Sequence, residues 1–307
     1  MSQIRWMRKS TRRISRLLSN GTEQISHTTV GRRLRDSGYS LRSNRKRLSL
    51  KVSPDRDAQF GQIRRRRQIF SRMGLPIISV DTKKRELVGL FKNSGKAWRK
   101  SWQDVGTYDF PSDAGGVAIP YGIHDVNRDE GFVVVGTSGN TPAFAASAIA
   151  KWWRETGRRN YRGADRILVL ADSGGSNGAK ARAWKSQLQK FANRTGLHIT
   201  VAHYPPGASK WNPVEHRLLS AISINWAGEP LVDYETVCGL IANTRLGSGK
   251  LCKVHLDTRR WPTQKQLAKD DHERLSEQLD NQILRVRHAR LLPALNYTIA
   301  PAASRRK

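Results

Sequence analysis

The spacing of apolar residues changes along this chain of 307 residues. Over residues 8–50 the apolar positions are few and recur at helical intervals, with breaks at Asn20-Gly21 and Gly38. From residue 76 they form short continuous or alternating runs, which are typical of strands. After residue 140 such runs alternate with helical stretches. The pattern predicts an α/β protein, a mixed sheet flanked by helices, behind a small N-terminal helical region.

Two pairs of expected strands stand at hairpin spacing. The first is 77–81 with 87–91, and the second is 121–126 with 132–137, joined by turn residues. A helix, a strand, a helix and a strand then follow, at 142–154, 167–171, 179–193 and 199–204. We expect residues 231–290 to be mostly helical and polar, with segments 286–292 and 297–299 closing the chain.

The N-terminal region predicts two short helices joined by a turn. Ser26 is a suitable cap for a helix that runs through Leu34, and Gly38 is a suitable stop. This second helix carries Arg32, Arg33 and Arg35. Such a unit resembles a helix-turn-helix that reads DNA, and a basic helical hairpin with a solvated face is the alternative.

Charge favours a polyanionic partner. The chain has 55 Lys and Arg against 25 Asp and Glu, and residues 1–72 hold 20 of these cations with only 4 acids. Binding phosphates releases counterions, which gives strong, salt-sensitive affinity with little sequence preference. We expect phosphate contacts from Arg45, Lys46 and Arg47, although a solvated surface is the simpler interpretation. Ribosomal and membrane-surface proteins are basic too, so charge alone does not decide the partner.

Two cysteines, Cys238 and Cys252, form no Cys-x-x-Cys pair, so neither a structural zinc site nor a disulfide framework is indicated. No apolar run approaches the length of a membrane span, and no signal segment opens the chain. We therefore expect a cytoplasmic, nucleoid-associated protein without a membrane partner.

Three carboxylates stand where an apolar strand ends or a helix begins. Asp81 follows the 77–80 run, Asp172 follows the 167–171 run, and Glu215 lies in the first turn of a later helix. Ligands of parallel sheets gather beyond the carboxyl ends of the strands. Hard divalent cations bind carboxylate oxygens. The three residues are therefore candidate ligands of a metal site.

Glu215 needs a separate argument, because a carboxylate in a first helical turn is also favoured by the helix dipole alone. Asn212 is a good helix cap and Pro213 suits the first helical position. An apolar stripe recurs every fourth residue at Val214, Leu218, Ile222 and Trp226. Glu215 lies one step off that stripe, so we expect it at the edge of the buried face.

Three segments together resemble the acidic motifs of the Rhodopirellula-type DDE transposases. They read ISVDTKKRELVG at 78–89, ADSGGSNG at 171–178 and PPGASKWNPVEHR at 205–217. The resemblance implies a ribonuclease H-like core whose catalytic and metal-binding triad is Asp81, Asp172 and Glu215. It also implies two Mg²⁺ or Mn²⁺ ions, double-stranded DNA (element ends and target) as partner, and a homodimer or higher assembly on DNA.

The same resemblance suggests four parts of the chain. These are a helix-turn-helix region at 1–45, a basic linker at 46–73, the catalytic core at 74–230 and a C-terminal, mostly helical extension at 231–307. The family has more chain before its helix-turn-helix, so we expect this module to start late here. Further candidate DNA contacts are Lys83, Lys84, Lys210 and Trp211, with a solvated surface as the simpler interpretation of the lysines and core packing as the alternative for Trp211.

Two other functions fit parts of the sequence. Residues 174–178 match G-x-S-x-G, so Ser176 with Asp233 and His255 would make a serine hydrolase. That interpretation leaves the basic charge and the other acidic motifs unexplained. A catalytically inactive transposase relic that binds DNA as a repressor is the second alternative.

Overall fold

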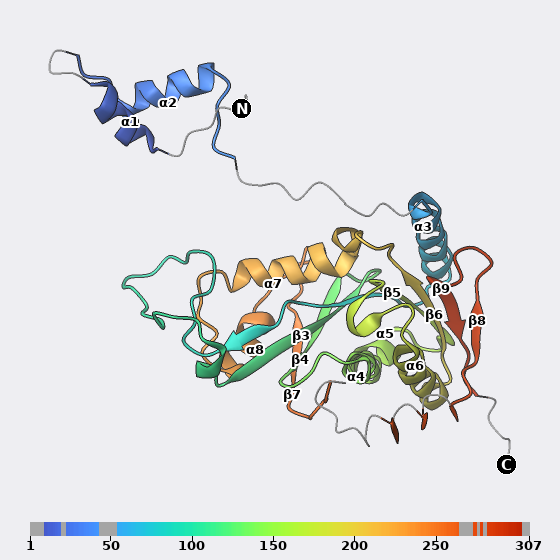
Figure 1. The fold of residues 1–307 in the computed structure, drawn as a ribbon. Helices are drawn as coiled ribbons and strands as arrows, with labels where there is room; N and C mark the ends of the chain where they lie inside the picture. The colour runs from blue at the N-terminus through green and yellow to red at the C-terminus, as the bar shows by residue number, and fades with distance from the viewer. Residues whose placement is uncertain are drawn as a thin grey trace. The chain divides into compact units, whose positions relative to one another are not determined.

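The computed structural model describes residues 9–19, 23–42, 54–263, 273–274, 277–278 and 281–302 (Figure 1). Two compact units divide the chain, Met1–Ser49 and Leu50–Lys307. In the described part of the chain, no helix is both long and apolar enough to cross a membrane.

The N-terminal unit contains helices α1 (Thr11–Leu18) and α2 (His27–Asp36). Ser26 caps α2 as expected, because its hydroxyl accepts a hydrogen bond from the Thr29 amide at 3.1 Å. Ile14 of α1 and Val30 of α2 are buried. The three arginines of α2 that we expect to contact DNA are all exposed, namely Arg32, Arg33 and Arg35.

A sheet of nine strands forms the centre of the second unit, within the described residues. The strands are β1 (Ile77–Thr82), β2 (Glu86–Val88), β3 (Gly116–Asp125), β4 (Glu130–Gly136), β5 (Arg166–Ala171), β6 (His198–His203), β7 (Lys253–Asp257), β8 (Val286–His288) and β9 (Asn296–Ile299). Their order is β7-β4-β3-β1-β5-β6-β9-β8, with β2 on β3. Strand β3 is antiparallel to β1 and β4, whereas β1, β5 and β6 are parallel. This central arrangement is that of the ribonuclease H-like fold, so the expected fold class is confirmed.

Helices cover both faces of the sheet (Figure 1). The α-helices are α3 (Arg56–Arg72), α4 (Pro142–Trp152), α5 (Arg158–Asn160), α6 (Arg182–Thr195), α7 (Ser220–Asn225) and α8 (Tyr234–Ala242). Short 3₁₀ turns lie at Pro111–Asp113, Gly175–Asn177 and Ser209–Trp211, and π-helical turns at Trp153–Gly157 and Glu215–Leu219. Successive strand side chains point to opposite faces. Accordingly Ile78 and Val80 pack with α4 and α6, whereas Ile77 packs with α3.

One of the two expected hairpins forms. Strands β3 and β4 pair as predicted, but β2 pairs with β3 and not with β1. The reason is that both edges of β1 are already occupied, by β3 on one side and β5 on the other. No edge remains on which β2 could fold back.

Helix α3 occupies most of the stretch that we expected to be a basic linker. It buries Ile63 and Phe70 against Leu168 and Leu170 of β5. These apolar side chains are spaced along a helix whose other positions are mainly arginine and glutamine. The polar composition therefore gave no indication that one face of this helix is buried. The segment therefore belongs to the core of the second unit.

The C-terminal stretch that we expected to be mostly helical adds strands to the sheet. Besides helix α8, its described part contains β7, which pairs with β4, and β9, which pairs with β6 and β8. Strands of three to five residues leave a weak sequence signal, because they contain too few positions to show a period. Strands β8 and β9 form at the two segments that close the chain.

Candidate functional site

Two aspartates lie at the carboxyl ends of the central strands β1 and β5. Val80 pairs with Ala171 in parallel register, so Asp81 and Asp172 each follow a paired position. Both line a cavity of about 430 Å³, together with loop residues such as Ser173 and Pro205–Gly207. The expected adjacency of the two strands is confirmed, and with it the placement of both aspartates at one edge of the sheet.

Glu215 joins Asp81 and Asp172 from the helices that pack on the sheet. It opens the π-helical turn Glu215–Leu219, and it is partly exposed while its neighbours Val214 and Leu218 are buried. This is the edge position that the apolar stripe predicts. Its carboxyl is close enough to share a hydrogen bond with Asp81, and its charge acts on Asp172 as well. Wide π-turns of this kind are frequent at functional sites.

The carboxylates are partly removed from water, and their negative charges repel one another. Burial, then the charge of Asp172, and then Glu215 raise the pKa of Asp81 to about 8, against the opposing hydrogen bond from the Thr82 amide. Burial and the charge of Glu215 raise the pKa of Asp172 to about 6, and a hydrogen bond from Asn212 opposes the shift. The carboxylate cluster therefore lacks a positive charge that would balance its negative charges.

A divalent cation would supply that charge, and carboxylate oxygens are the donors that Mg²⁺ and Mn²⁺ take. Among the described residues, no three His, Cys, Asp or Glu side chains already stand at the spacing of a finished metal site. The triad fits such a cation in donor type and in electrostatics.

Asn212 links the three elements that carry the carboxylates, although the sequence suggested only a helix cap. Its buried amide donates to Asp172 Oδ1 at 3.0 Å and to the Val80 carbonyl at 3.2 Å. The Ser79 hydroxyl donates to Asn212 Oδ1 and accepts from the Val214 amide at 2.9 Å. One side chain therefore fixes Asp172 relative to β1 and to the turn that bears Glu215. A polar Ser79 inside an apolar strand is the signal that could have revealed this network.

We expect Asn212→Ala to lower the free energy of unfolding by about 2–4 kcal/mol, because it leaves several buried polar groups without partners. Thermal or urea unfolding measures the loss. The control is Asn225→Ala, which removes an exposed side chain whose amide, among the described residues, donates only to the Leu240 carbonyl. Equal stability of the Asn212 and Asn225 variants would show that this network does not hold the site together.

A second network supports Asp172 from behind. His203 donates from Nδ1 to the Asp172 carbonyl at 2.8 Å and accepts at Nε2 from the Tyr297 hydroxyl at 3.0 Å. Burial lowers the pKa of His203 to about 4, so the ring is neutral near pH 7. The Gln59 amide donates to the His203 carbonyl at 2.7 Å and also bonds Asn296. Helix α3 and strand β9 thus support the strand ends that carry Asp172, a role the sequence did not suggest.

The expected DNA contacts in this unit differ in their surroundings. Lys84, Lys210 and Trp211 are exposed, and the Lys210 ammonium lies 5.1 Å from the centre of the Trp211 ring. Lys83 instead turns inward, since its ammonium lies 3.4 Å from Glu86 and 4.6 Å from the centre of the Trp226 ring. A structural role therefore suits Lys83 better than DNA contact. The expected contacts Arg45, Lys46 and Arg47 lie outside the described residues.

The alternative serine triad does not assemble. Ser176 is buried beside Thr82, at 3.5 Å between the hydroxyl oxygens. Asp233 caps α8 by accepting from the Thr236 amide, and His255 bonds Glu155 at 2.7 Å. Because both intended partners are engaged elsewhere, the serine hydrolase interpretation is wrong.

Comparisons with known proteins give one family. A family model described as "Rhodopirellula transposase DDE domain" matches residues 1–301. No curated protein matches the chain significantly. Similar solved structures include a Mos1 transposase paired-end complex with the left transposon end (15% identity, TM-score 0.46) and a pre-cleavage Mos1 transpososome (15% identity, TM-score 0.45). Each match covers 75% of this chain, and 64% and 65% of the Mos1 chains respectively. This chain thus spans just under two thirds of the structures it matches.

Proposed function

This chain belongs to the Rhodopirellula transposase DDE family, and we propose that it cuts and joins DNA strands by metal-dependent phosphoryl transfer at Asp81, Asp172 and Glu215. One observation carries the proposal. Three carboxylates that are far apart in sequence act on one another electrostatically at the carboxyl edge of the sheet. A buried cluster of like charges costs stability, so its presence is best explained by a cationic ligand.

Asp81, Asp172 and Glu215 would hold two Mg²⁺ or Mn²⁺ ions. Bound there, the ions would stabilise negative charge on the attacking and leaving oxygens of an in-line displacement at phosphorus. The protein contributes position, because Asn212 fixes the Asp172 carboxylate. Asp81 carries a proton at neutral pH in the metal-free protein and releases it when it becomes a ligand.

The reaction needs no nucleophilic side chain. Water attacks in strand cleavage, and a DNA 3′-hydroxyl attacks in strand transfer, so catalysis consists mainly of positioning and charge neutralisation. This agrees with the surroundings of Ser176, which has no base beside it in the described structure.

Double-stranded DNA, both element ends and target, is the proposed partner. The exposed arginines of α2 suit phosphate contacts and a helix-turn-helix reading of the ends. Lys84, Lys210 and Trp211 are exposed and suit contacts near the cut site, where the indole ring can stack on an unpaired base. Because two ends must be joined, the active species is proposed to be at least a dimer.

The decisive experiment measures cleavage of DNA that carries the element's terminal repeats. We expect cutting with Mn²⁺ or Mg²⁺ and none with EDTA, because the carboxylates alone offer neither a nucleophile nor positive charge. Gel analysis of labelled strands detects both cleavage and joined products.

Two results would contradict the proposal. Cutting that continues in EDTA would exclude a metal-dependent reaction. Tight DNA binding without cleavage under any divalent metal would instead indicate the repressor-like relic.

A further inference from the structure

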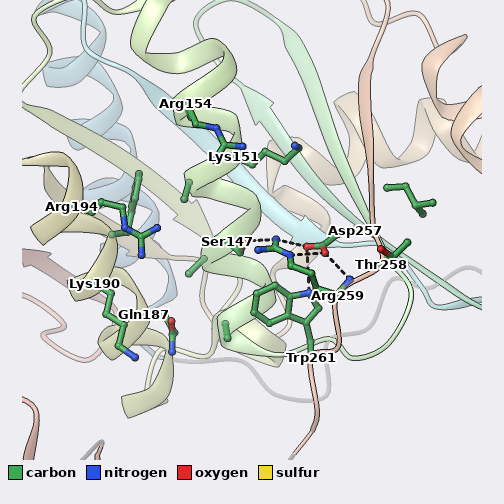
Figure 2. A pocket seen from close by; sticks show the side chains of 15 residues that line it. Ser147, Lys151, Arg154, Gln187, Lys190, Arg194, Asp257, Thr258, Arg259 and Trp261 are labelled. Carbon is green, nitrogen blue, oxygen red and sulfur yellow. Dashed lines mark hydrogen bonds and ion pairs between the residues drawn. The ribbon is translucent and has the colours of Figure 1, made fainter.

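A second cavity, of about 490 Å³, lies over helices α4 and α6. Figure 2 shows side chains from three elements around it: Gln187, Lys190 and Arg194 from α6, Ser147, Lys151 and Arg154 from α4 and the turn after it, and Asp257, Arg259 and Trp261 from the end of β7 onward. It shares no lining residue with the cavity that contains Asp81 and Asp172. The two cavities are therefore separate sites.

The lining of this cavity is strongly basic. Arg259 is neutralised by Asp257, with which it forms two hydrogen bonds at 2.7 and 2.8 Å. Lys151 and Arg154 both form ion pairs with the single carboxylate of Glu155, at 2.9 and 3.3 Å. In the described structure, Lys190 and Arg194 are exposed and have no acidic partner. The cations of the cavity thus outnumber the nearby carboxylates.

Four of the cations come from two helical stretches. Lys151 and Arg154 are three residues apart on one helical stretch, and Lys190 and Arg194 are four apart on α6, so each pair lies on one face of its helix. The lining also includes the small side chains of Ala143, Ala146 and Ala150. Like charges gathered around one cavity repel, and an anion bound among them would remove that repulsion.

We propose that this cavity binds phosphate groups of a DNA backbone, at a distance from the phosphate that is cut. The inference rests on the proposed function for the identity of the polyanion. Two of its cations, Lys190 and Arg194, are exposed and lie on the same face of α6, which suits contact with successive phosphates of a chain. The Gln187 amide and the Thr258 hydroxyl are additional neutral donors of the kind that bind phosphate oxygens.

The test compares two full-length variants without added metal. Lys190→Gln/Arg194→Gln removes the two cations that have no acidic partner. The control, Arg158→Gln/Arg162→Gln, removes two exposed arginines from the α5 stretch outside the cavity. Affinity for a short duplex of arbitrary sequence is measured by fluorescence anisotropy over a series of salt concentrations, and thermal melting checks that both variants are folded.

We expect the cavity variant to bind about tenfold or more weakly at low salt, with the salt slope reduced by about 1.8, since each lost phosphate contact removes about 0.9. The control should change the slope much less. Equal slopes for the two variants would overturn the proposal. The proposal would also be overturned if inorganic tripolyphosphate bound wild type but not the cavity variant while the two proteins bound DNA equally well. The cavity would then hold a small polyanion.

The outcome is independent of catalysis. Because no metal is present and Asp172→Asn protein can be used throughout, a slope change is measured whether or not the carboxylates cut DNA. If the wild-type protein fails to cleave DNA while the cavity variant still reduces the salt slope, the proposed activity is wrong and the proposed phosphate site is supported.

Discussion

Asp172→Asn is expected to lower Mn²⁺-dependent DNA cleavage by about 10³-fold or more, since one ligand charge supports several kcal/mol of transition-state stabilisation. The substitution keeps the shape of the side chain and the oxygen that accepts from Asn212. It removes only the charge and one donor oxygen. Fold and DNA affinity should therefore be unchanged. Cleavage assays with labelled element ends measure the effect.

The matched control is Asp125→Asn. Asp125 is also buried with a pKa raised by burial, but it lies at the opposite end of the β1–β3 pairing, where it accepts from the Tyr161 hydroxyl. Its replacement should leave cleavage near the wild-type rate. If Asp172→Asn cuts DNA as well as wild type does, Asp172 is not part of the active site.

Asp81→Asn is expected to stabilise the metal-free protein at pH 8 while removing activity. The carboxyl pKa rises from an ordinary 3.8 to about 8 on folding. Between these values the folded state holds a proton that the unfolded state has released, so stability falls as pH rises through this range. A shift of one pKa unit corresponds to about 1.4 kcal/mol, so we expect a decline of about 2 kcal/mol or more in wild type. The variant should show much less of it.

Thermal melting at pH 5 and pH 8, with and without Mn²⁺, measures the loss of stability and its reversal by the metal. Both pH values lie in the range between the ordinary and the raised pKa of Asp81. Mn²⁺ should restore the stability of wild type at the higher pH, because the cation replaces the proton. The asparagine variant should gain little from Mn²⁺. An identical loss of stability with pH in both proteins would show that Asp81 is not the group that titrates.

Local sequence pattern was sufficient for the positions of the carboxylates. An apolar run followed at once by Asp indicated the end of a buried strand, as at Asp81 and Asp172. The four-residue stripe through Val214 and Leu218 placed Glu215 at the edge of a buried face. The capping of α2 by Ser26 was equally readable. Each of these features depends on neighbours a few residues away, and the sequence contains that information directly.

Contacts between distant segments followed from register and packing alone. Which edge receives β2, which face of α3 is buried, and that Asn212 turns inward to Asp172 depend on how strands and helices meet in three dimensions. The bracing of Asp172 by His203 and Tyr297 depends on β9 pairing with β6, across nearly a hundred residues. The same holds for the basic cavity, whose cations sit on two helices that the sequence separates. Periodicity reports the face of one element, but only the folded chain decides which faces meet.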